Sequence, residues 1–351
     1  MNIPIKSKSP FVVYIIFFIL LITACESDLK LDIHDSVPLL TVNCILKVDE
    51  SVKMLLTENQ LLQNPSDSSH LIRNASVHLI EDDAFLDSLV YKEYKFNGQI
   101  TSAYVSSKDY KPLAGHSYQI KVVVPAYKSI TSSTVIPQPV QIISIDTISV
   151  YLKNGSYTYK VLECTVRFKD PTPGKNYYKL SIDRFGLFKI CQSGPFGCTT
   201  HLIKYNASFI CYDNNTVYRR IDHNSPGPIS LENENEEIWF DELFIADDVF
   251  NGNIYELKVY IRPDWFSDWA YPPAGENITY RTAYIRLYSV NEEYYKYSKS
   301  YFNHLFMKND LFSEPVQVYS NILNGTGIFS GASVSIDSSI IIPVRYNPQF
   351  N

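Results

Sequence analysis

The sequence lacks the short motifs that mark many enzymes. It contains no G-x-S-x-G nucleophile elbow, no H-E-x-x-H zinc helix and no phosphate-binding P-loop. Its seven histidines are scattered singly, away from cysteines and carboxylates at useful spacings. The stretch NGTGIFSG is superficially like a dinucleotide fingerprint, but its spacing is one residue too long and no βαβ pattern follows. We predict a turn there, and we predict no cofactor, metal site or catalytic residue.

A basic block is also missing. The chain has 31 lysines and arginines against 37 acidic residues, a net charge of −6. Removal of residues 1–24 takes away Lys6 and Lys8 and leaves 29 bases, a net charge of −8. An acidic chain of this kind is a poor match for nucleic acid and for electrostatic binding to anionic lipid.

No apolar run is long enough to span a membrane comfortably. The longest near the N-terminus, Phe11 to Ala24, has 14 residues, whereas a spanning helix needs about 20. A basic head and a short apolar core are typical of an export signal. Ile22-Thr23-Ala24-Cys25 resembles a lipobox, which predicts a signal peptide at 1–24, acylation of Cys25 and a tether over 25–35. An uncleaved anchor is the alternative.

Five cysteines remain besides Cys25. Cys191 and Cys198 bracket the loop CQSGPFGC and are candidates for a disulfide, with Cys211 as a competing partner. Free thiols are an alternative, and zinc fits less well because six intervening residues exceed the usual ligand spacing. Cys44 and Cys164 share strand faces with apolar neighbours, which predicts buried thiols.

Alternating apolar and polar residues predict strands along most of the chain. They recur in NASVHLI, SYQIKVVV, YTYKVLECTVRF and IYELKVYI, separated by Asn-Gly turns. Short strands at this spacing favour a mainly β protein with two Ig-like β-sandwich domains. The segment VIPQPV predicts the boundary between residues 36–137 and a larger domain at 138–351.

One helix is predicted near residues 290–308. Ser289 and Glu292 fit an S-x-x-E capping box. An aromatic and apolar stripe follows at helical spacing and predicts a face that covers the second sandwich; it comprises Tyr294, Tyr297, Tyr301 and Leu305.

Two segments are candidates for binding. RPDWFSDWAYPPAG places four aromatic residues on a proline-rich loop, where they either bind a partner or fold back as a plug; they are Trp265, Phe266, Trp269 and Tyr271. The segment ENENEEIWFDELFIADD holds eight acids and no base, which favours a solvated loop over a calcium site. The enzymatic alternative is a metal-assisted hydrolase that uses Glu236, Asp241 and Asp248.

A set of stretches in a fixed order resembles a known family. The stretches are NASVHL, TSSTVIP, FKDPTPGKNYYKLSI, DDVFNGNIYELKV, LYSVNEEYYKYSKS and EPVQVYSNILNGTGIFSGAS. Over nearly the whole mature chain they resemble Bacteroidota outer-membrane lipoproteins that carry domain of unknown function 4249. Members are commonly encoded beside TonB-dependent receptors, so the resemblance implies an accessory lipoprotein. It carries over no catalytic residues.

From these observations we expect a non-catalytic binding or interaction protein of the outer membrane. Its expected partners are membrane lipid, through Cys25, and a TonB-dependent β-barrel receptor. Glu26 and Asp28 follow the acylated cysteine and resemble a surface-export signal, which favours the cell surface over the periplasmic face. A purely structural role in the envelope is a further alternative.

Overall fold

The computed structural model describes residues 38–48, 50–59, 70–96, 99–154, 157–191, 198–206, 208–211, 239–261, 278–307, 316–335 and 339–341. Within these ranges the strands form a 14-stranded sheet and a five-stranded sheet. One helix, α2 (Glu292–Met307), is present in the same ranges. The protein is therefore mainly β, as the alternating pattern predicts. Among these residues no helix is long and apolar enough to cross a membrane.

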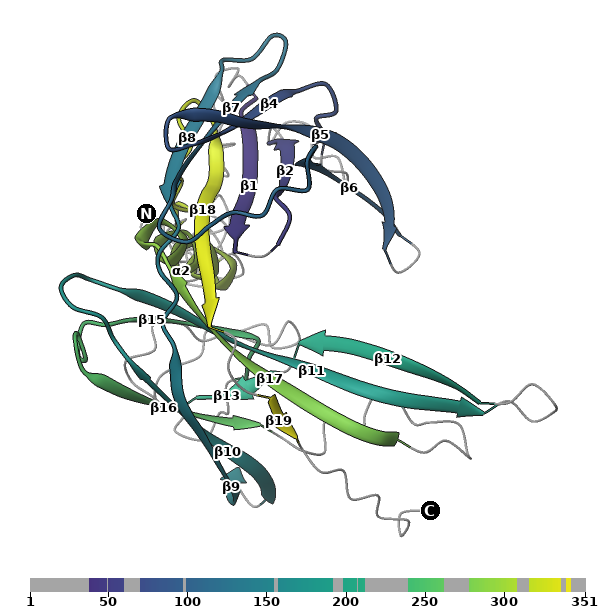
Figure 1. The fold of residues 1–351 in the computed structure, drawn as a ribbon, viewed down its shortest axis with the longest axis vertical. Coiled ribbons are helices and arrows are strands. Elements are labelled where there is room, and N and C mark those ends of the chain that lie inside the picture. The colour runs from purple at the N-terminus through teal and green to yellow at the C-terminus, as the bar shows by residue number, and fades with distance from the viewer. Residues whose placement is uncertain are drawn as a thin grey trace, which may run out of the picture. The chain divides into compact units, whose positions relative to one another are not determined.

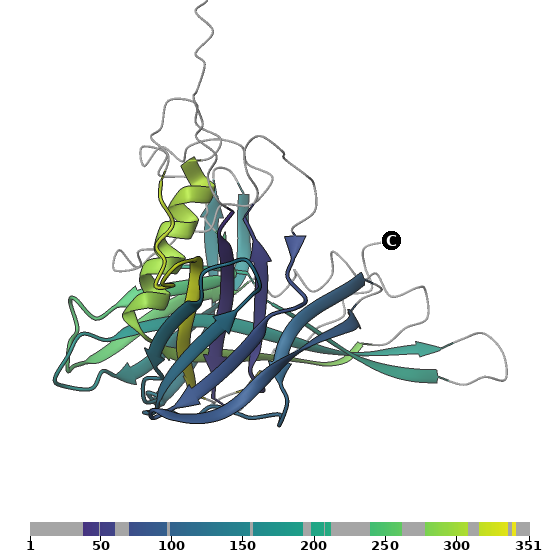
Figure 2. The same ribbon diagram turned by 90° about the horizontal axis from the view of Figure 1, so that it is seen from above.

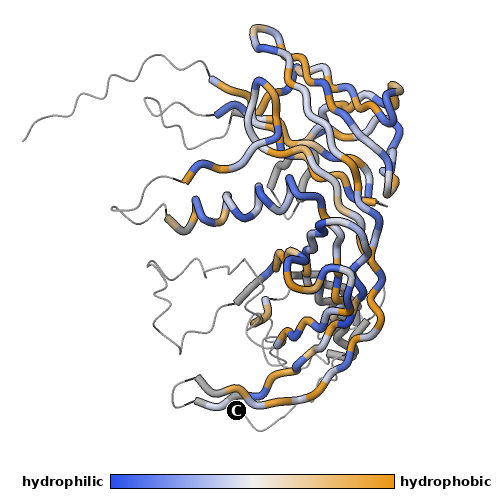
Figure 3. Tube along the Cα trace, turned by 90° about the vertical axis from the view of Figure 1, so that its left-hand side faces the viewer, coloured by the Kyte–Doolittle hydropathy of each residue, from blue (hydrophilic) through white to orange (hydrophobic). Residues whose placement is uncertain are grey.

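The N-terminal strands surround one apolar core (Figure 1), which we call the N-terminal core. Strand β7 shows the underlying pattern, because Tyr118, Ile120 and Val122 are buried while the residues between them are exposed. Figure 3 shows the same alternation of hydropathy along the strands. These strands are β1 (Leu40–Lys47), β2 (Lys53–Glu58), β3 (His70–Leu71), β4 (Ser76–Glu81), β5 (Ala84–Phe96), β6 (Gln99–Ser106), β7 (Ser117–Val123) and β8 (Ile130–Val135).

A second apolar core, the C-terminal core, lies among the strands that follow β8 in the sequence. Side chains of the five-stranded sheet, in the order β14-β13-β16-β10-β9, share this core with β11, β15 and β17 of the large sheet. The strands are β9 (Ile142–Asn154), β10 (Tyr157–Lys169), β11 (Tyr177–Cys191), β12 (Cys198–Asn206), β13 (Phe209–Ile210), β14 (Trp239–Phe240), β15 (Glu242–Ala246), β16 (Ile254–Ile261), β17 (Ile278–Val290), β18 (Thr326–Ser335) and β19 (Ser339–Ile341).

Strand β18 connects the two groups of strands. It pairs in parallel with β1, with Val42 opposite Gly327, and antiparallel with β17, with Val290 opposite Ala332. Figure 1 shows it running from one group to the other. Its residue Phe329 is buried in the N-terminal core. The C-terminal part of the sequence thus completes the sheet that the N-terminal strands begin.

The segment between β8 and β9 is the predicted boundary at Pro137 and Pro139, and part of it is buried. Ile136 is fully buried and packs so closely on β18 that a Cβ at Gly331 would lie 2.7 Å from its Cγ1 atom. The hydroxyls of Ser289 and Ser335 accept hydrogen bonds from the amides of Val140 and Ile142. This segment is therefore bound to β17 and β18.

Helix α2 begins and ends close to the predicted bounds. Its cap differs from the prediction, because the side chain of Asn291 accepts a hydrogen bond from the amide of Tyr294, whereas Ser289 lies in β17. Phe244, Ala332 and Tyr295 belong to a third core, the helix core, beneath α2, and Figure 2 shows α2 beside β18. The predicted stripe is partly wrong: Tyr294 packs on this core, but Tyr301 and Leu305 are 44% and 42% exposed.

Candidate functional site

Several residues singled out from the sequence lie outside the described residues. They are Cys25, Glu26, Asp28, Glu236 and the four aromatic residues Trp265, Phe266, Trp269 and Tyr271. Their expected roles stay predictions.

The two described members of the proposed acidic metal site do not converge. Asp241 and Asp248 lie at opposite ends of β15, roughly 20 Å apart along an extended chain. Asp241 accepts a hydrogen bond from Ser208, and Asp248 pairs with Lys175 at 2.7 Å. Across the described ranges, no group of three or more His, Cys, Asp or Glu side chains could hold a metal ion. The two carboxylates therefore have separate partners and do not form the metal site of the hydrolase alternative.

Charged side chains do gather on the face of the large sheet that α2 partly covers. On β11, Tyr178, Leu180 and Ile182 enter the C-terminal core, so the residues between them point to the opposite face. The strand register places Ser181 opposite Arg286 of β17 and opposite Glu242 of β15. We call this surface the polar face; it comprises Lys179, Ser181, Asp183, Glu242, Arg286, Tyr288 and Tyr294.

Lys179 is the most deeply buried charge of the polar face, with a side chain that is 5% exposed. Its Nζ atom lies 2.9 Å from Glu242 Oε1 and 3.5 Å from the hydroxyl of Tyr294. The rings of Tyr288 and Tyr294 lie 4.7 Å and 5.6 Å from the same nitrogen, which adds cation–π attraction. The ammonium group thus has a partner on several sides.

The pKa of Lys179 reflects these partners. Burial alone lowers the pKa of a lysine, but the groups around Lys179, including the Glu242 carboxylate, outweigh burial and raise it above its ordinary value. Lys179 is therefore positively charged at neutral pH. A lysine that acts as a nucleophile needs the opposite shift, so this residue is a fixed charge.

A second ion pair continues the polar face along the same strands. Arg286 Nε lies 2.6 Å from Asp183 Oδ2, and their side chains are 28% and 8% exposed. Two pairs of opposite charge thus lie along β11, one with Glu242 of β15 and one with Arg286 of β17. Because both are held by strands, their positions are fixed by the sheet and not by a loop.

At the first turn of α2 the charges are more exposed. Tyr177 donates a hydrogen bond to Glu292, which also pairs with Lys296 at 3.1 Å. The bonds from Lys296 and Tyr177 lower the pKa of Glu292. Tyr295 packs on Tyr177 with ring centroids 4.8 Å apart. This contact joins the start of α2 to the start of β11.

Two buried carboxylates hold the loops next to this turn. Asp170 accepts hydrogen bonds from the hydroxyl of Tyr178 and the amide of Gly252, and Asp247 accepts from the amide of Asn176. Burial and the nearby Asp170 raise the pKa of Asp247. These side-chain bonds add to backbone hydrogen bonds that the amides of Asp170 and Asp247 donate to Asn253 and Asn176, so the role of both acids is structural.

A comparable cluster closes one end of the N-terminal core. Glu81 Oε1 accepts hydrogen bonds from the hydroxyls of Tyr110 and Tyr118, at 2.6 Å and 2.5 Å. His116 lies 2.7 Å from Asp82, whose carboxylate also accepts from the amide of Ser117. The amide of Ser117 and the neighbouring His116 lower the pKa of Asp82. The cluster fixes the β4–β5 turn.

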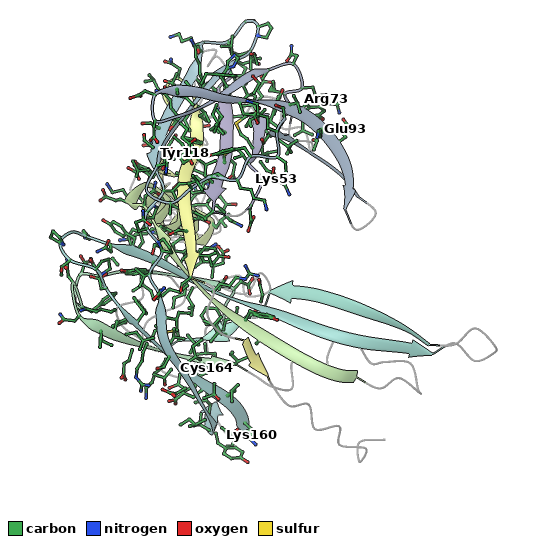
Figure 4. The ribbon with its side chains drawn as sticks, viewed as in Figure 1. Lys53, Arg73, Glu93, Tyr118, Lys160 and Cys164 are labelled. Carbon is green, nitrogen blue, oxygen red and sulfur yellow. The ribbon has the colours of Figure 1, made fainter. Side chains whose placement is uncertain are left out.

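The described cysteines agree with part of the sequence prediction. Cys44 and Cys164 are buried thiols, one in each main core, as predicted. Burial raises the pKa of each to about 12, so neither forms a thiolate at neutral pH. Figure 4 labels Cys164 among the C-terminal strands and Tyr118 among the N-terminal strands. Cys211 is also buried, in the C-terminal core.

The family described as "Domain of unknown function (DUF4249)" matches residues 26–337. The chain belongs to this family. The DUF4249 match spans both main cores, α2 and the polar face. No curated protein is similar enough to the chain to be counted as a match.

Sequence reasoning missed the polar face of this DUF4249 protein. Lys179 lies in the alternating stretch NYYKLSI, and this pattern predicts an ordinary outward-facing residue at its position. Only the pairing of β11 with β15 and β17 brings it beside Glu242 and Tyr288. The one local signal is a lysine between tyrosines on a strand, which is too common to identify a buried pair.

Proposed function

We propose that the protein is an outer-membrane lipoprotein that binds a protein partner and has no catalytic role. The observation that most directly supports the absence of a catalytic role is the polar face, most of whose side chains are buried. Its charges are paired and held by strands, with Lys179 between Glu242 and two tyrosine rings. Charges that are paired and buried in this way favour a structural role for the polar face over proton transfer.

The lipid anchor is proposed from the sequence. Cys25 follows a short apolar run and the residues Ile22-Thr23-Ala24. Acylation of one residue by several chains would hold the protein firmly on a membrane, since a single chain binds only marginally. We place the anchor in the outer membrane, with the cell surface favoured by Glu26 and Asp28.

The proposed partner is a TonB-dependent β-barrel receptor, and the proposed role is ligand capture or transport. Family membership and the resemblance to Bacteroidota lipoproteins support this choice. The aromatic segment at 265–271 is the proposed contact, because tyrosine and tryptophan carry much of the affinity in many interfaces.

The two main cores support a finer proposal for the fold. Each is assigned to an Ig-like β-sandwich, with a boundary near residue 137, and the first sandwich is completed by β18.

Gentle detergent extraction and mass spectrometry of the co-purifying proteins test the proposed function. We expect a β-barrel receptor to be recovered at near-equal amounts with the unmodified chain, and at several-fold lower amounts with the double variant Trp265→Ala and Trp269→Ala. Tyr151→Ala is the matched control, because Tyr151 is an exposed aromatic residue on β9. Repeated recovery of the lipoprotein alone would contradict the proposal.

Cys25→Ala is a second arm of the same experiment. The variant is expected to lose palmitate labelling and to leave the membrane fraction. A variant that still labels and still partitions with membranes would refute acylation at Cys25.

A further inference from the structure

We propose that Cys191 and Cys198 form a disulfide that closes the end of the β11–β12 hairpin. The backbone register places these two residues directly opposite each other, as the last of nine paired positions between the strands. Directly opposed residues of an antiparallel pair have Cα atoms about 4.5 to 5.5 Å apart. This interval falls within the range that a disulfide requires, about 4.4 to 6.8 Å.

The other cysteines are placed away from this pair. Cys44 is buried in the N-terminal core and Cys164 in the C-terminal core. Phe168 of the C-terminal core packs on Tyr178 of β11, with ring centroids 4.9 Å apart. Cys211 lies in the same core, whereas Cys191 lies 13 residues beyond Tyr178, roughly 40 Å along an extended strand. Cys211 is therefore a poor competitor for Cys191.

Cys211 and Cys164 are also too far apart to pair with each other. Val259 of β16 lies opposite Cys164, and Tyr260 lies opposite Ile210 on the other edge of β16. Cys211 then stands level with Val259, so two strand spacings separate it from Cys164, about 10 Å. A disulfide spans at most about 7 Å between Cα atoms. The register leaves Cys191 and Cys198 as the pair that fits.

The bond forms by thiol–disulfide exchange with a disulfide-containing oxidant, such as oxidised glutathione. The thiolate of one cysteine attacks the oxidant and releases one reduced thiol, which gives a mixed disulfide. The second cysteine, as its thiolate, then displaces the other half of the oxidant. The two protein thiols lose two hydrogen atoms in total, and the oxidant gains them. Oxidation in the cell rests on the proposed export, whereas pairing of these two cysteines does not.

The test uses the full chain, purified and equilibrated with mixtures of oxidised and reduced glutathione, then blocked with an alkylating agent. Peptide mass mapping is expected to show one intramolecular bond between Cys191 and Cys198, with both protected from alkylation in the oxidising mixtures. Cys191→Ser is expected to abolish that bond and expose Cys198 to alkylation. Cys211→Ser is the matched control and is expected to leave the bond intact.

Two results would overturn the pairing. One is a bond mapped to Cys211, and the other is full alkylation of Cys191 and Cys198 in every mixture. The same mapping on protein alkylated inside intact cells separates the two proposals. A pair that oxidises in the glutathione mixtures but is found reduced in cells contradicts the proposed export and supports the pairing.

Discussion

Lys179 and Glu242 form an unequal pair, because the lysine side chain is 5% exposed and the glutamate side chain is 44% exposed. Loss of the glutamate leaves a buried positive charge, whereas loss of the lysine leaves a carboxylate that water can solvate. The stability of this site therefore depends mainly on the more exposed partner.

We expect Glu242→Gln to lower the free energy of unfolding by about 2 kcal/mol, less than for a fully buried pair because water screens Glu242. Lys179→Met is expected to cost less than about 1 kcal/mol, since a thioether packs well against tyrosine rings. Urea unfolding of both variants measures the difference. Glu50→Gln is the control, because its pair with Lys47 is on the surface. A larger loss for Lys179→Met would contradict this account.

Residue-level burial was predictable where it follows from strand alternation. The sequence places Cys44 beside Val42 and Leu46 on one strand face, and all three are buried. Lys179 obeys the same alternation, yet it is buried because α2 lies over that face. Alternation predicts which side of a strand a residue occupies. It does not predict which other element covers that side and buries the residue.

At the scale of elements, the parallel pairing of β1 with β18 depends on a glycine. Gly327 has a φ of +102°, and a Cβ there would lie 1.9 Å from the carbonyl oxygen of Val42. Gly174 also has a positive φ, +136°, but nothing lies within 4 Å of its Cβ position. A comparison of these two glycines therefore distinguishes the effect of the backbone conformation on stability from the effect of close contact with Val42.

We expect Gly327→Ala to lower the free energy of unfolding by more than about 3 kcal/mol, because β1 and β18 must separate to admit the methyl group and the residue must keep a positive φ. Gly174→Ala is expected to cost about 1 to 2 kcal/mol, from its backbone conformation alone. Urea unfolding midpoints and slopes compare the two variants. Similar losses would show that close approach to Val42 is not the deciding factor.

The sequence predicts the bounds of helix α2 but not its capping residue. The 3.6-residue period located α2 within a few residues of Glu292–Met307. The cap was misassigned because Ser289 and Asn291 are both good capping residues. Asn291 takes the role, and Ser289 remains in β17, where its hydroxyl accepts from Val140. The hydrogen bond between Val140 and Ser289 thus accompanies the choice of Asn291 as the capping residue.

At the scale of the molecule, the N-terminal strands depend on residues near the other end of the chain. Phe329 fills part of the N-terminal core, and Ser132 donates a hydrogen bond to the carbonyl of Asn321. The alternating pattern of the sequence predicts the strands but not this pairing, because 285 positions separate the bonded hydroxyls of Thr41 and Thr326. No local pattern encodes a contact at that separation.

A fragment of residues 36–137 is therefore expected to lack a cooperative unfolding transition. Without β18, the edge of β1 is exposed to water, and so is the part of the N-terminal core that Phe329 fills. Addition of residues 320–335 through a flexible linker of about 15 residues is expected to restore the transition. Circular dichroism during urea titration monitors both fragments. Cooperative unfolding of the shorter fragment would contradict the role given to β18.

The position of β18 in the sequence also determines when the sheet can be completed during synthesis. Strand β1 ends at Lys47, but its parallel partner is complete only at Ser335. At about 5 to 20 residues per second, a ribosome needs roughly 15 to 60 s to make the chain between them. Throughout that interval the nascent chain carries an open strand edge, which is a template for aggregation. The open edge of β1 can therefore be closed only after the last strands of the chain have been made.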